Sequence, residues 1–269
     1  MKRPPSLCAF ALLLVATVTF SACRTEEAKH KAAGNVLFKQ GKLEQAIKEY
    51  RASLALDSKD PNAHTLLGDA LFEQQKYEEA RAEFQAALKQ DPKARAALRD
   101  LAMLDLRVKR EPEAKALLAR MIAAEPRDAE AHAALGKILY AEGDLDGAER
   151  HLREALTQAQ NDPAALYSLG LVLAKKRDQV QANAIFDRLD RAAPGKAYAP
   201  YGRAVAAAIS GHDDDALKWL AVALDRGIDD LGEVERDPSF AALRASPKFQ
   251  SLLAAAKLRA PPKKGSPGP

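Results

Sequence analysis

The amino-acid sequence predicts an all-α fold, a solenoid of six stacked helix pairs, because one pattern of small and apolar residues recurs with a fixed period. Small residues stand 34 positions apart, at Gly34, Gly68, Ala102, Gly136, Gly170 and Ala204. An alanine follows each of them after 12 positions, and a large apolar residue follows four further on, at Tyr50, Phe84, Leu118, Leu152, Phe186 and Leu220. A period of this length, kept without insertion, is typical of stacked supersecondary units.

Each repeat has apolar residues at helical spacing on both sides of a short polar break, which predicts two helices. In the second repeat, Leu67, Leu71 and Phe72 have the spacing of the first of these helices. The glycine or alanine column predicts a close approach of the two helix backbones, where a larger side chain would overpack. One such pair cannot bury its apolar face alone, so the stacked pairs are expected to share a core.

The period and the skeleton of "LLGDALFEQQKYEEARAEF" resemble the tetratricopeptide repeat. The resemblance covers residues 27–230 and implies a right-handed superhelical array of helix-turn-helix units. The implied unit boundaries are 27–60, 61–94, 95–128, 129–162, 163–196 and 197–230.

The remaining C-terminal residues are expected to close the stack. Residues 231–259 are predicted to form capping helices, because Asp237-Pro238 and Ser246-Pro247 each indicate an N-cap followed by proline at the first helical position. Terminal repeats of a solenoid need such a cover over their apolar face. Residues 260–269, "APPKKGSPGP", are rich in proline and glycine and are predicted to be a disordered tail.

The N-terminus has the order of a secretory signal, with a positive start, an apolar run and small residues before Cys23. The apolar run is shorter than the ~20 residues of a spanning helix. "FSAC" resembles the lipobox of bacterial lipoproteins, which implies cleavage after residue 22 and acylation of Cys23. Residues 1–22 are then a lipoprotein signal peptide, and residues 23–26 are the lipidated N-terminus and a short tether. The alternative is an ordinary signal peptide with a chance cysteine at its border.

The expected location is the cell envelope, with a membrane anchor at Cys23 and the repeats in the periplasm. Arg24 stands where many lipoproteins of the inner membrane have aspartate, so the resemblance favours the outer membrane. The 41 basic and 37 acidic side chains are mixed along the chain. Nucleic-acid binding needs a clustered basic face, so no nucleic-acid partner is expected.

The sequence contains no motif of a catalytic or metal site, and we expect no enzyme activity, no cofactor and no metal. His30, His64 and His132 share the fourth place of their repeats. Packed helices lie about 8–10 Å apart, so these histidines cannot reach the ~2.0–2.1 Å of zinc ligands around one ion. They are expected to pack between helices, and His151 is expected to be isolated. The acidic run of "HDDDA" at 212–216 is explained by its place at a helix start.

The resemblance implies a partner-binding groove on the concave face, formed by the first helix of each pair. The family's groove places lie three and four residues apart, on one helix face. The groove residues so implied are Lys31, Asn35, Phe38, Phe72, Arg99, Met103, Tyr140, Tyr167, Leu171, Tyr198, Tyr201 and Val205. They change from charged to aromatic toward the C-terminus, and tyrosine is enriched at protein interfaces. The alternative is that the capping helices or the tail of the chain cover the aromatic end.

Lys31 and Asn35 match the first half of the carboxylate clamp by which some relatives hold a chaperone C-terminus. Leu66, Ala96 and Asp100 stand where the other clamp residues would be needed. We therefore expect no chaperone clamp, and we expect Lys31 to be a solvated surface lysine.

Together these patterns predict a membrane-anchored scaffold that binds a protein partner in the periplasm during assembly of an envelope complex. The resemblance includes pilotins of type IV pilus secretins and adaptor lipoproteins. The alternative function is a structural lipoprotein that associates with itself into homo-oligomers.

Overall fold

The computed structural model describes residues 25–228 and 230–259. The predicted signal peptide, the lipidation site at Cys23 and the tail at 260–269 lie outside the described residues. Within the described residues the secondary structure is helical, with no strand. No helix in this part of the chain has the length and apolar character needed to cross a membrane.

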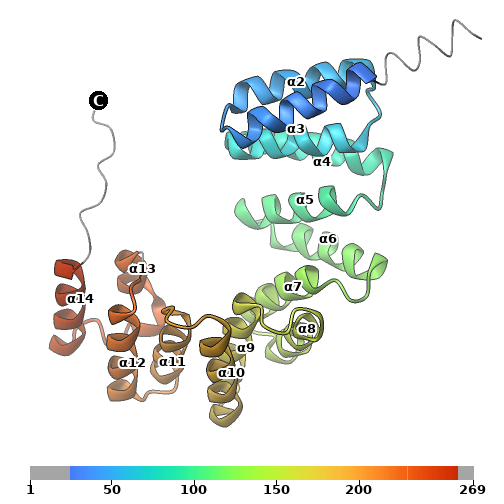
Figure 1. The fold of residues 1–269 in the computed structure, drawn as a ribbon. Coiled ribbons are helices and arrows are strands. Elements are labelled where there is room, and N and C mark those ends of the chain that lie inside the picture. The colour runs from blue at the N-terminus through green and yellow to red at the C-terminus, as the bar shows by residue number, and fades with distance from the viewer. Residues whose placement is uncertain (1–24, 229, 260–269) are drawn as a thin grey trace, which may run out of the picture. The chain divides into compact units, whose positions relative to one another are not determined.

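The chain divides into two compact units, Met1–Pro126 and Arg127–Pro269, here called unit 1 and unit 2. Unit 1 contains three helix pairs (Figure 1). The first pair is the helix that includes residues 25–39, followed by α2 (Leu43–Leu56). The others are α3 (Pro61–Glu73) with α4 (Tyr77–Gln90), and α5 (Arg95–Arg107) with α6 (Glu111–Ala124).

Unit 2 contains three further pairs and the C-terminal segment. The pairs are α7 (Ala129–Glu142) with α8 (Leu145–Gln158), α9 (Pro163–Lys175) with α10 (Gln179–Ala192), and α11 (Tyr198–Ile209) with α12 (Asp213–Asp225). The C-terminal segment is α13 (Leu231–Arg236), the 3-10 helix η1 (Pro238–Phe240) and α14 (Pro247–Arg259). In both units the two helices of a pair pack on each other, and α4 on α5 or α8 on α9 join successive pairs. This packing of consecutive helix pairs is the predicted solenoid fold.

The small-residue column is a place of close approach, as predicted, and at its glycines the nearest contact is the large side chain 16 positions later rather than the backbone of the second helix. A Cβ atom at Gly68 would lie 2.5 Å from Cε1 of Phe84, and Gly34 has the same relation to Tyr50. Gly170 faces Phe186 in unit 2 in the same way. The large apolar residue 16 positions later therefore fills the space that the missing side chain leaves, and both columns describe one contact.

Aspartates fix the start of several first helices. Asp60, Asp128 and Asp162 precede α3, α7 and α9, and each accepts a hydrogen bond from a backbone N–H of the first turn. An N-cap of this kind stabilises a helix by about 1 kcal/mol. Repeated capping at this place sets the boundary between successive pairs.

The turn inside each pair passes through the left-handed region of φ and ψ at one fixed place. The residues there have φ between 61° and 87° and are Gly41, Gln75, Lys109, Gly143, Arg177 and Gly211. Half of them carry a side chain, which costs about 1–2 kcal/mol in this conformation. The sequence shows this column only as a mixture of glycine and polar residues, and we did not predict it.

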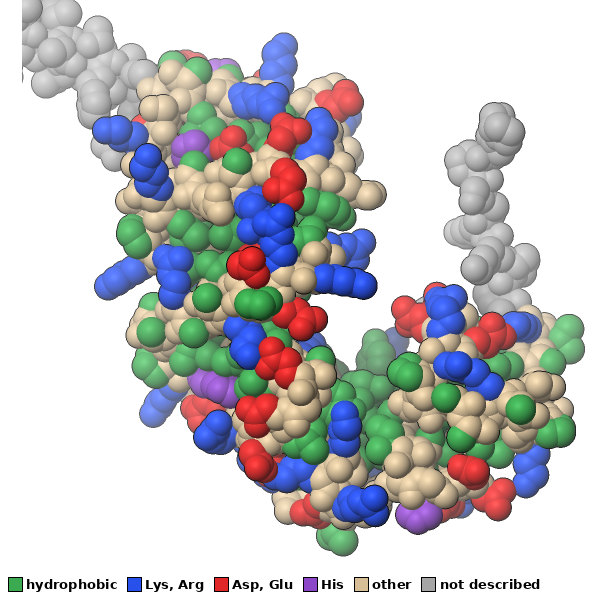
Figure 2. Space-filling model, turned by 180° about the vertical axis from the view of Figure 1, so that it is seen from behind, with side chains coloured by type: hydrophobic (Ala, Val, Ile, Leu, Met, Phe, Trp, Pro, Cys, Tyr) green, Lys and Arg blue, Asp and Glu red, His purple; other side chains and the backbone are tan. Residues whose placement is uncertain are grey.

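Ion pairs link successive repeats on the surface. Lys176 contacts Asp146 at 2.5 Å and Glu149 at 2.7 Å, so it joins the turn of one pair to the helix of the preceding pair. In unit 1, Arg110 reaches Glu78 at 3.2 Å in the same way. Basic and acidic side chains accordingly lie side by side on the face seen in Figure 2.

The C-terminal segment covers the end of unit 2. Phe240 and Phe249 are buried, and the two ring centroids are 5.8 Å apart. Two helix starts were predicted in this segment, each from an N-cap residue followed by proline. Ser246-Pro247 precedes the long helix α14, whereas Asp237-Pro238 precedes only the 3-10 helix η1. Tyr201 contacts this 3-10 segment twice, through a hydrogen bond of 2.7 Å from its hydroxyl to Asp237 and through a ring contact of 5.9 Å with Phe240.

Candidate partner-binding faces

In unit 1 the first helices present a face of three polar and three large apolar side chains, which we call the unit-1 face. They are Asn35, Phe38, Asp69, Phe72, Arg99 and Met103. Met103 is 53% exposed, while Phe38 and Phe72 are half-buried. Asn35 accepts a hydrogen bond of 2.8 Å from the hydroxyl of Tyr50, whose pKa is raised to about 12 by burial and then by the charge of Asp69.

Lys31 is not the solvated lysine that the sequence predicted. Its ammonium group lies 2.6 Å from Asp60 and 2.5 Å from Glu27, and its side chain is 25% exposed. Burial opposes the charged form, but the hydrogen bonds to Asp60 and Glu27 outweigh it and raise the pKa of Lys31. The lysine therefore holds the first pair to the N-cap of α3. Glu27 lies four positions before Lys31, but Asp60 lies 29 positions after it, so the spacing of the repeat did not reveal this contact with the N-cap of α3.

The unit-1 face includes one member of a carboxyl pair. Asp69 of α3 and Asp100 of α5 lie together, and Arg99 donates to Asp100 at 2.8 Å. Burial first, and the neighbouring Asp100 second, raise the pKa of Asp69 to about 7. Near neutral pH the Asp69 carboxyl is therefore protonated in a large fraction of molecules and can donate a hydrogen bond. The two residues are 31 positions apart, so no sequence pattern indicated the pair.

In unit 2 the first helices present a tyrosine face, which we define as Tyr140, Tyr167, Tyr198 and Tyr201. Tyr198 is 53% exposed, and the other three rings are partly buried against the core of unit 2. Lys175 lies over the Tyr140 ring, with its ammonium nitrogen 4.9 Å from the centroid.

Asp237 of the C-terminal segment faces the partly buried tyrosines. Burial first, and the charge of Asp237 next, raise the pKa of Tyr140 and of Tyr167. Burial and the hydrogen bond to Asp237 raise the pKa of Tyr201. The hydroxyls are therefore neutral hydrogen-bond donors over the whole physiological pH range.

Part of the predicted groove in unit 2 is covered by the chain itself. Leu171 is 8% exposed and Val205 is 3% exposed, and both belong to the hydrophobic core rather than to the surface. Tyr201 is held against Asp237 and Phe240 of the C-terminal segment. The capping segment thus covers the far end of the aromatic surface and leaves Tyr198 exposed.

The histidines at the fourth place of repeats one, two and four each contact the second helix of their own pair. His30 lies 2.7 Å from Glu49, and His64 lies 2.7 Å from Glu83. His151, which we expected to be isolated, contacts His132 with 2.8 Å between their Nδ1 atoms. Burial first, and His132 second, lower the pKa of His151. These four histidines are thus part of contacts within helix pairs. No group of three metal-ligating side chains occurs among the described residues.

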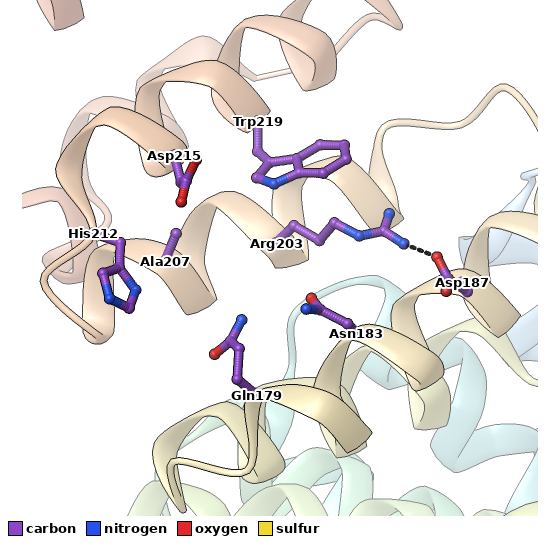
Figure 3. A pocket seen from close by; sticks show the side chains of 8 residues that line it. All are labelled: Gln179, Asn183, Asp187, Arg203, Ala207, His212, Asp215 and Trp219. Atoms are coloured by element: carbon purple, nitrogen blue, oxygen red, sulfur yellow. Dashed lines mark hydrogen bonds and ion pairs between the residues drawn. The ribbon is translucent and has the colours of Figure 1, made fainter.

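A pocket of about 490 Å³ lies between α10, α11 and α12 in unit 2. Its lining residues are Gln179, Asn183, Asp187, Arg203, Ala207, His212, Asp215 and Trp219 (Figure 3). The guanidinium of Arg203 is 4.8 Å from the Trp219 ring centroid and pairs with Asp187. Arg203 is only 9% exposed, so this arrangement ties α11 to both neighbouring second helices. It is a packing contact between two repeats rather than a continuation of the tyrosine face.

Comparison with known proteins gives one family for most of the repeat region. Models of the tetratricopeptide repeat match residues 31–95, 71–138 and 136–176, so together they extend from 31 to 176. No curated protein matches the chain.

Several solved structures have the same fold. PilF of Pseudomonas aeruginosa is 19% identical, with a TM-score of 0.66 over 87% of this chain and 99% of PilF. YrrB, a TPR protein with an unusual peptide-binding site, is 22% identical, with a TM-score of 0.56 over 68% of this chain and 94% of YrrB. A tetratricopeptide repeat protein of Parabacteroides merdae is 16% identical, with a TM-score of 0.59 over 88% of this chain and 89% of its own. From the matched repeats and the stacked helix pairs we conclude that the chain belongs to the tetratricopeptide-repeat family.

Proposed function

We propose that the protein is a membrane-anchored scaffold that binds a protein partner through the first helices of its repeats. The observation that carries the proposal is the exposure of Met103 and Tyr198. Each is a large apolar side chain, 53% exposed, at a first-helix place where the family resemblance implies ligand contact. Exposed apolar side chains rimmed by polar ones are typical of interaction surfaces.

The unit-1 face offers a partner the more accessible surface. Met103 supplies apolar area, and Arg99 with the Asp69–Asp100 pair supplies charge and hydrogen bonds beside it. An interface of this kind has an apolar centre and a polar rim. In unit 2 the corresponding surface is reduced to Tyr198 and the partly buried Tyr140 and Tyr167. We therefore assign the main docking site to unit 1.

We further propose an envelope role, with Cys23 acylated and the repeats in the periplasm at the outer membrane. The support is the lipobox-like "FSAC" after an apolar run. The fold is similar to that of PilF, and the lipoproteins that the sequence resembles include pilotins of type IV pilus secretins. We therefore propose that the protein assists in assembling such a secretin or a similar envelope complex. The same anchor also suits an adaptor for another envelope protein.

Site-specific photocrosslinking in the native envelope tests the docking site. A photoreactive phenylalanine at Met103 should give one discrete crosslinked partner, because that side chain faces the proposed interface. The same amino acid at Val180, which is 82% exposed on the second helix α10, is the matched control. A partner that crosslinks equally from Val180, or from neither position, would argue against docking through the first helices.

The lipid anchor is tested separately by Cys23→Ser in cells supplied with radiolabelled palmitate. The wild-type chain should incorporate label and migrate as the processed form, while the variant should remain an unlabelled precursor. A variant that is still processed and labelled would show that Cys23 is not the modified residue. That result would leave the docking proposal intact.

A second candidate function is self-association, and one surface favours it. Leu258 of α14 is 89% exposed at the C-terminal end of unit 2. An apolar side chain there could pair with the same surface of a second copy. Light scattering over a hundredfold range of protein concentration should then show a mass increase that Leu258→Glu abolishes. A constant monomer mass would rule this function out.

A further inference from the structure

We propose that the C-terminal tail, residues 260–269, binds across the tyrosine face of its own chain at Tyr198 and Tyr167 and competes there with any other ligand. The tail follows α14 directly and has the sequence APPKKGSPGP. Four arguments support it: unpaired charge on the face, the point where the tail begins, its length, and its chemistry. The inference does not require a protein partner, so its failure would leave the proposed function standing.

Two carboxylates beside the tyrosine face have no ion-pair partner among the described residues. Asp237 accepts the Tyr201 hydroxyl at 2.7 Å and the backbone N–H of Ser239 at 2.8 Å, which are both neutral donors. Glu233 is exposed one turn earlier, on α13, and its charge also acts on Tyr201. The tail contains Lys263 and Lys264 and no acidic side chain. Its charge is therefore complementary to this edge of the face.

The described chain ends at the same end of the helix stack as Tyr198. Lys257 near the end of α14 pairs with Glu235 of α13 at 2.5 Å, and Arg259 pairs with Asp225 at the end of α12. The next residue after Asp225, Arg226, donates to the backbone carbonyl of Lys196 at 3.3 Å. Tyr198 follows two positions later as the first residue of α11. A short path of contacts thus joins the start of the tail to the tyrosine face, and the ends of α13 and α14 lie together in Figure 1.

The tail is long enough for this path. Ten residues in an extended, proline-rich conformation span about 31 Å at ~3.1 Å per residue. Neighbouring helices are about 8–10 Å apart, so crossing from α14 past α12 to α11 takes about 20 Å. The remaining length can cover Tyr198 and reach toward Tyr167.

The chemistry of the two surfaces also matches. Proline-rich segments bind grooves lined by aromatic side chains, because they lose little conformational entropy when they dock. Tyr198 offers an exposed ring, and the Tyr167 hydroxyl makes no hydrogen bond within the described residues and can donate to a backbone carbonyl. Lys175 already occupies the Tyr140 ring. The tail lysines are therefore placed at Asp237 and Glu233 rather than at Tyr140.

The test compares two chains that both begin at Arg24 and so keep every described residue. One ends at Pro269 and the other at Arg259. The probe is a fluorescent synthetic peptide of residues 260–269, and the readout is fluorescence anisotropy. An attached tail has an effective concentration in the millimolar range, so the peptide should bind the chain that ends at Arg259 at least tenfold more tightly than the chain that ends at Pro269.

Variants locate the site. In the shortened chain, Tyr198→Ala and Glu233→Gln should each weaken peptide binding at least threefold. Val180→Ala, at an exposed side chain of the second helix α10, should leave it unchanged. A peptide with Lys263 and Lys264 replaced by glutamate should bind at least tenfold more weakly.

Three outcomes would overturn the inference. They are no binding of the peptide to the shortened chain at millimolar concentration, equal binding to both chains, or binding that Tyr198→Ala leaves unchanged. If the shortened chain instead dimerises through Tyr198 and does not bind the peptide, the occupant of the face is a second copy and the tail proposal is wrong.

Discussion

Units 1 and 2 are built from the same helix pair, yet their first-helix faces differ in polarity and in accessibility. Unit 1 presents a half-buried carboxyl pair, Asp69 and Asp100, beside the exposed Met103. Unit 2 presents tyrosines that are partly covered by the C-terminal segment through Tyr201. The backbone pattern is therefore independent of the surface that it carries.

The difference follows from which columns of the repeat are buried within a pair. The small residue and the large apolar residue 16 positions later contact each other in both units, as Gly68 with Phe84 and Gly170 with Phe186 show. The first-helix face is not used by that contact, so its residues can vary without loss of the fold. A solenoid can thus change its ligand while its core stays the same.

The largest expected effect comes from removing one core ring in each unit. Phe84 is 1% exposed and Phe186 is fully buried. Truncation of a buried phenylalanine to alanine costs about 3–5 kcal/mol. Trp219 is the one tryptophan of the chain and lies in unit 2, so its fluorescence reports unit 2 alone, whereas far-UV circular dichroism reports both units.

In urea, Phe186→Ala should therefore lower the midpoint of the fluorescence transition. Phe84→Ala should shift the circular dichroism transition and leave the fluorescence midpoint near the wild-type value. Equal shifts of the two signals in both variants would show that the units unfold as one and would remove the energetic basis of the comparison.

A medium effect is expected from pH, with opposite sign in the two units. The pKa of Asp69 is about 7 in the folded protein against an ordinary value of 3.8, so the folded state binds more protons between these values. Unit 1 should lose stability as the pH rises from about 4 to about 7. The pKa of His151 is lowered from 6.5 by burial and by His132, so unit 2 should lose stability as the pH falls below about 6.5.

Asp69→Asn tests the first half of this prediction. It removes the charge and keeps the shape, and we expect it to stabilise unit 1 at pH 7.5 by about 1–3 kcal/mol, the usual cost of a poorly satisfied buried polar group. The variant should also lose the dependence on pH between 4 and 7 in urea titrations followed by circular dichroism. Asp91→Asn, at an exposed carboxyl of the same unit, is the control. An unchanged pH profile would show that Asp69 is ionised in the folded state.

The smallest expected effect concerns the left-handed turn residues. Gln75 in unit 1 and Arg177 in unit 2 have φ of 61° and 64°, and both side chains are exposed. Replacement of either by glycine removes the strain and should stabilise its own unit by about 1 kcal/mol or less. The matched reverse change is Gly143→Ala at the same place of another repeat, which should be destabilising. Thermal melts of the three variants provide the measurement, and a loss of stability in both glycine variants would contradict the assigned turn conformation.

The fold was accessible from the sequence because its signals repeat. Each helix pair uses the same small and large columns, so six weak patterns in register predict what one pattern could not. The individual site residues were less accessible. Lys31 was expected in solvent but pairs with Asp60, and Leu171 and Val205 were expected in a groove but lie in the core. These residues follow the spacing of the family motif, but their environment depends on other elements of the fold. Lys31 pairs with the N-cap of α3, and Leu171 and Val205 lie in the core of unit 2.

The sequence was enough to predict a tetratricopeptide-repeat solenoid and the columns that form its core, because these properties depend on contacts within about 34 residues. Only the tertiary structure decided the pairing of Asp69 with Asp100, of His132 with His151, and of Tyr201 with Asp237. The His132–His151 contact has the same 19-residue spacing as His30–Glu49 and His64–Glu83, but the other two pairs follow no spacing that recurs along the chain. Burial and charge act through distance in space, so the folded arrangement determines which groups are paired, which are neutral and which remain available to a ligand.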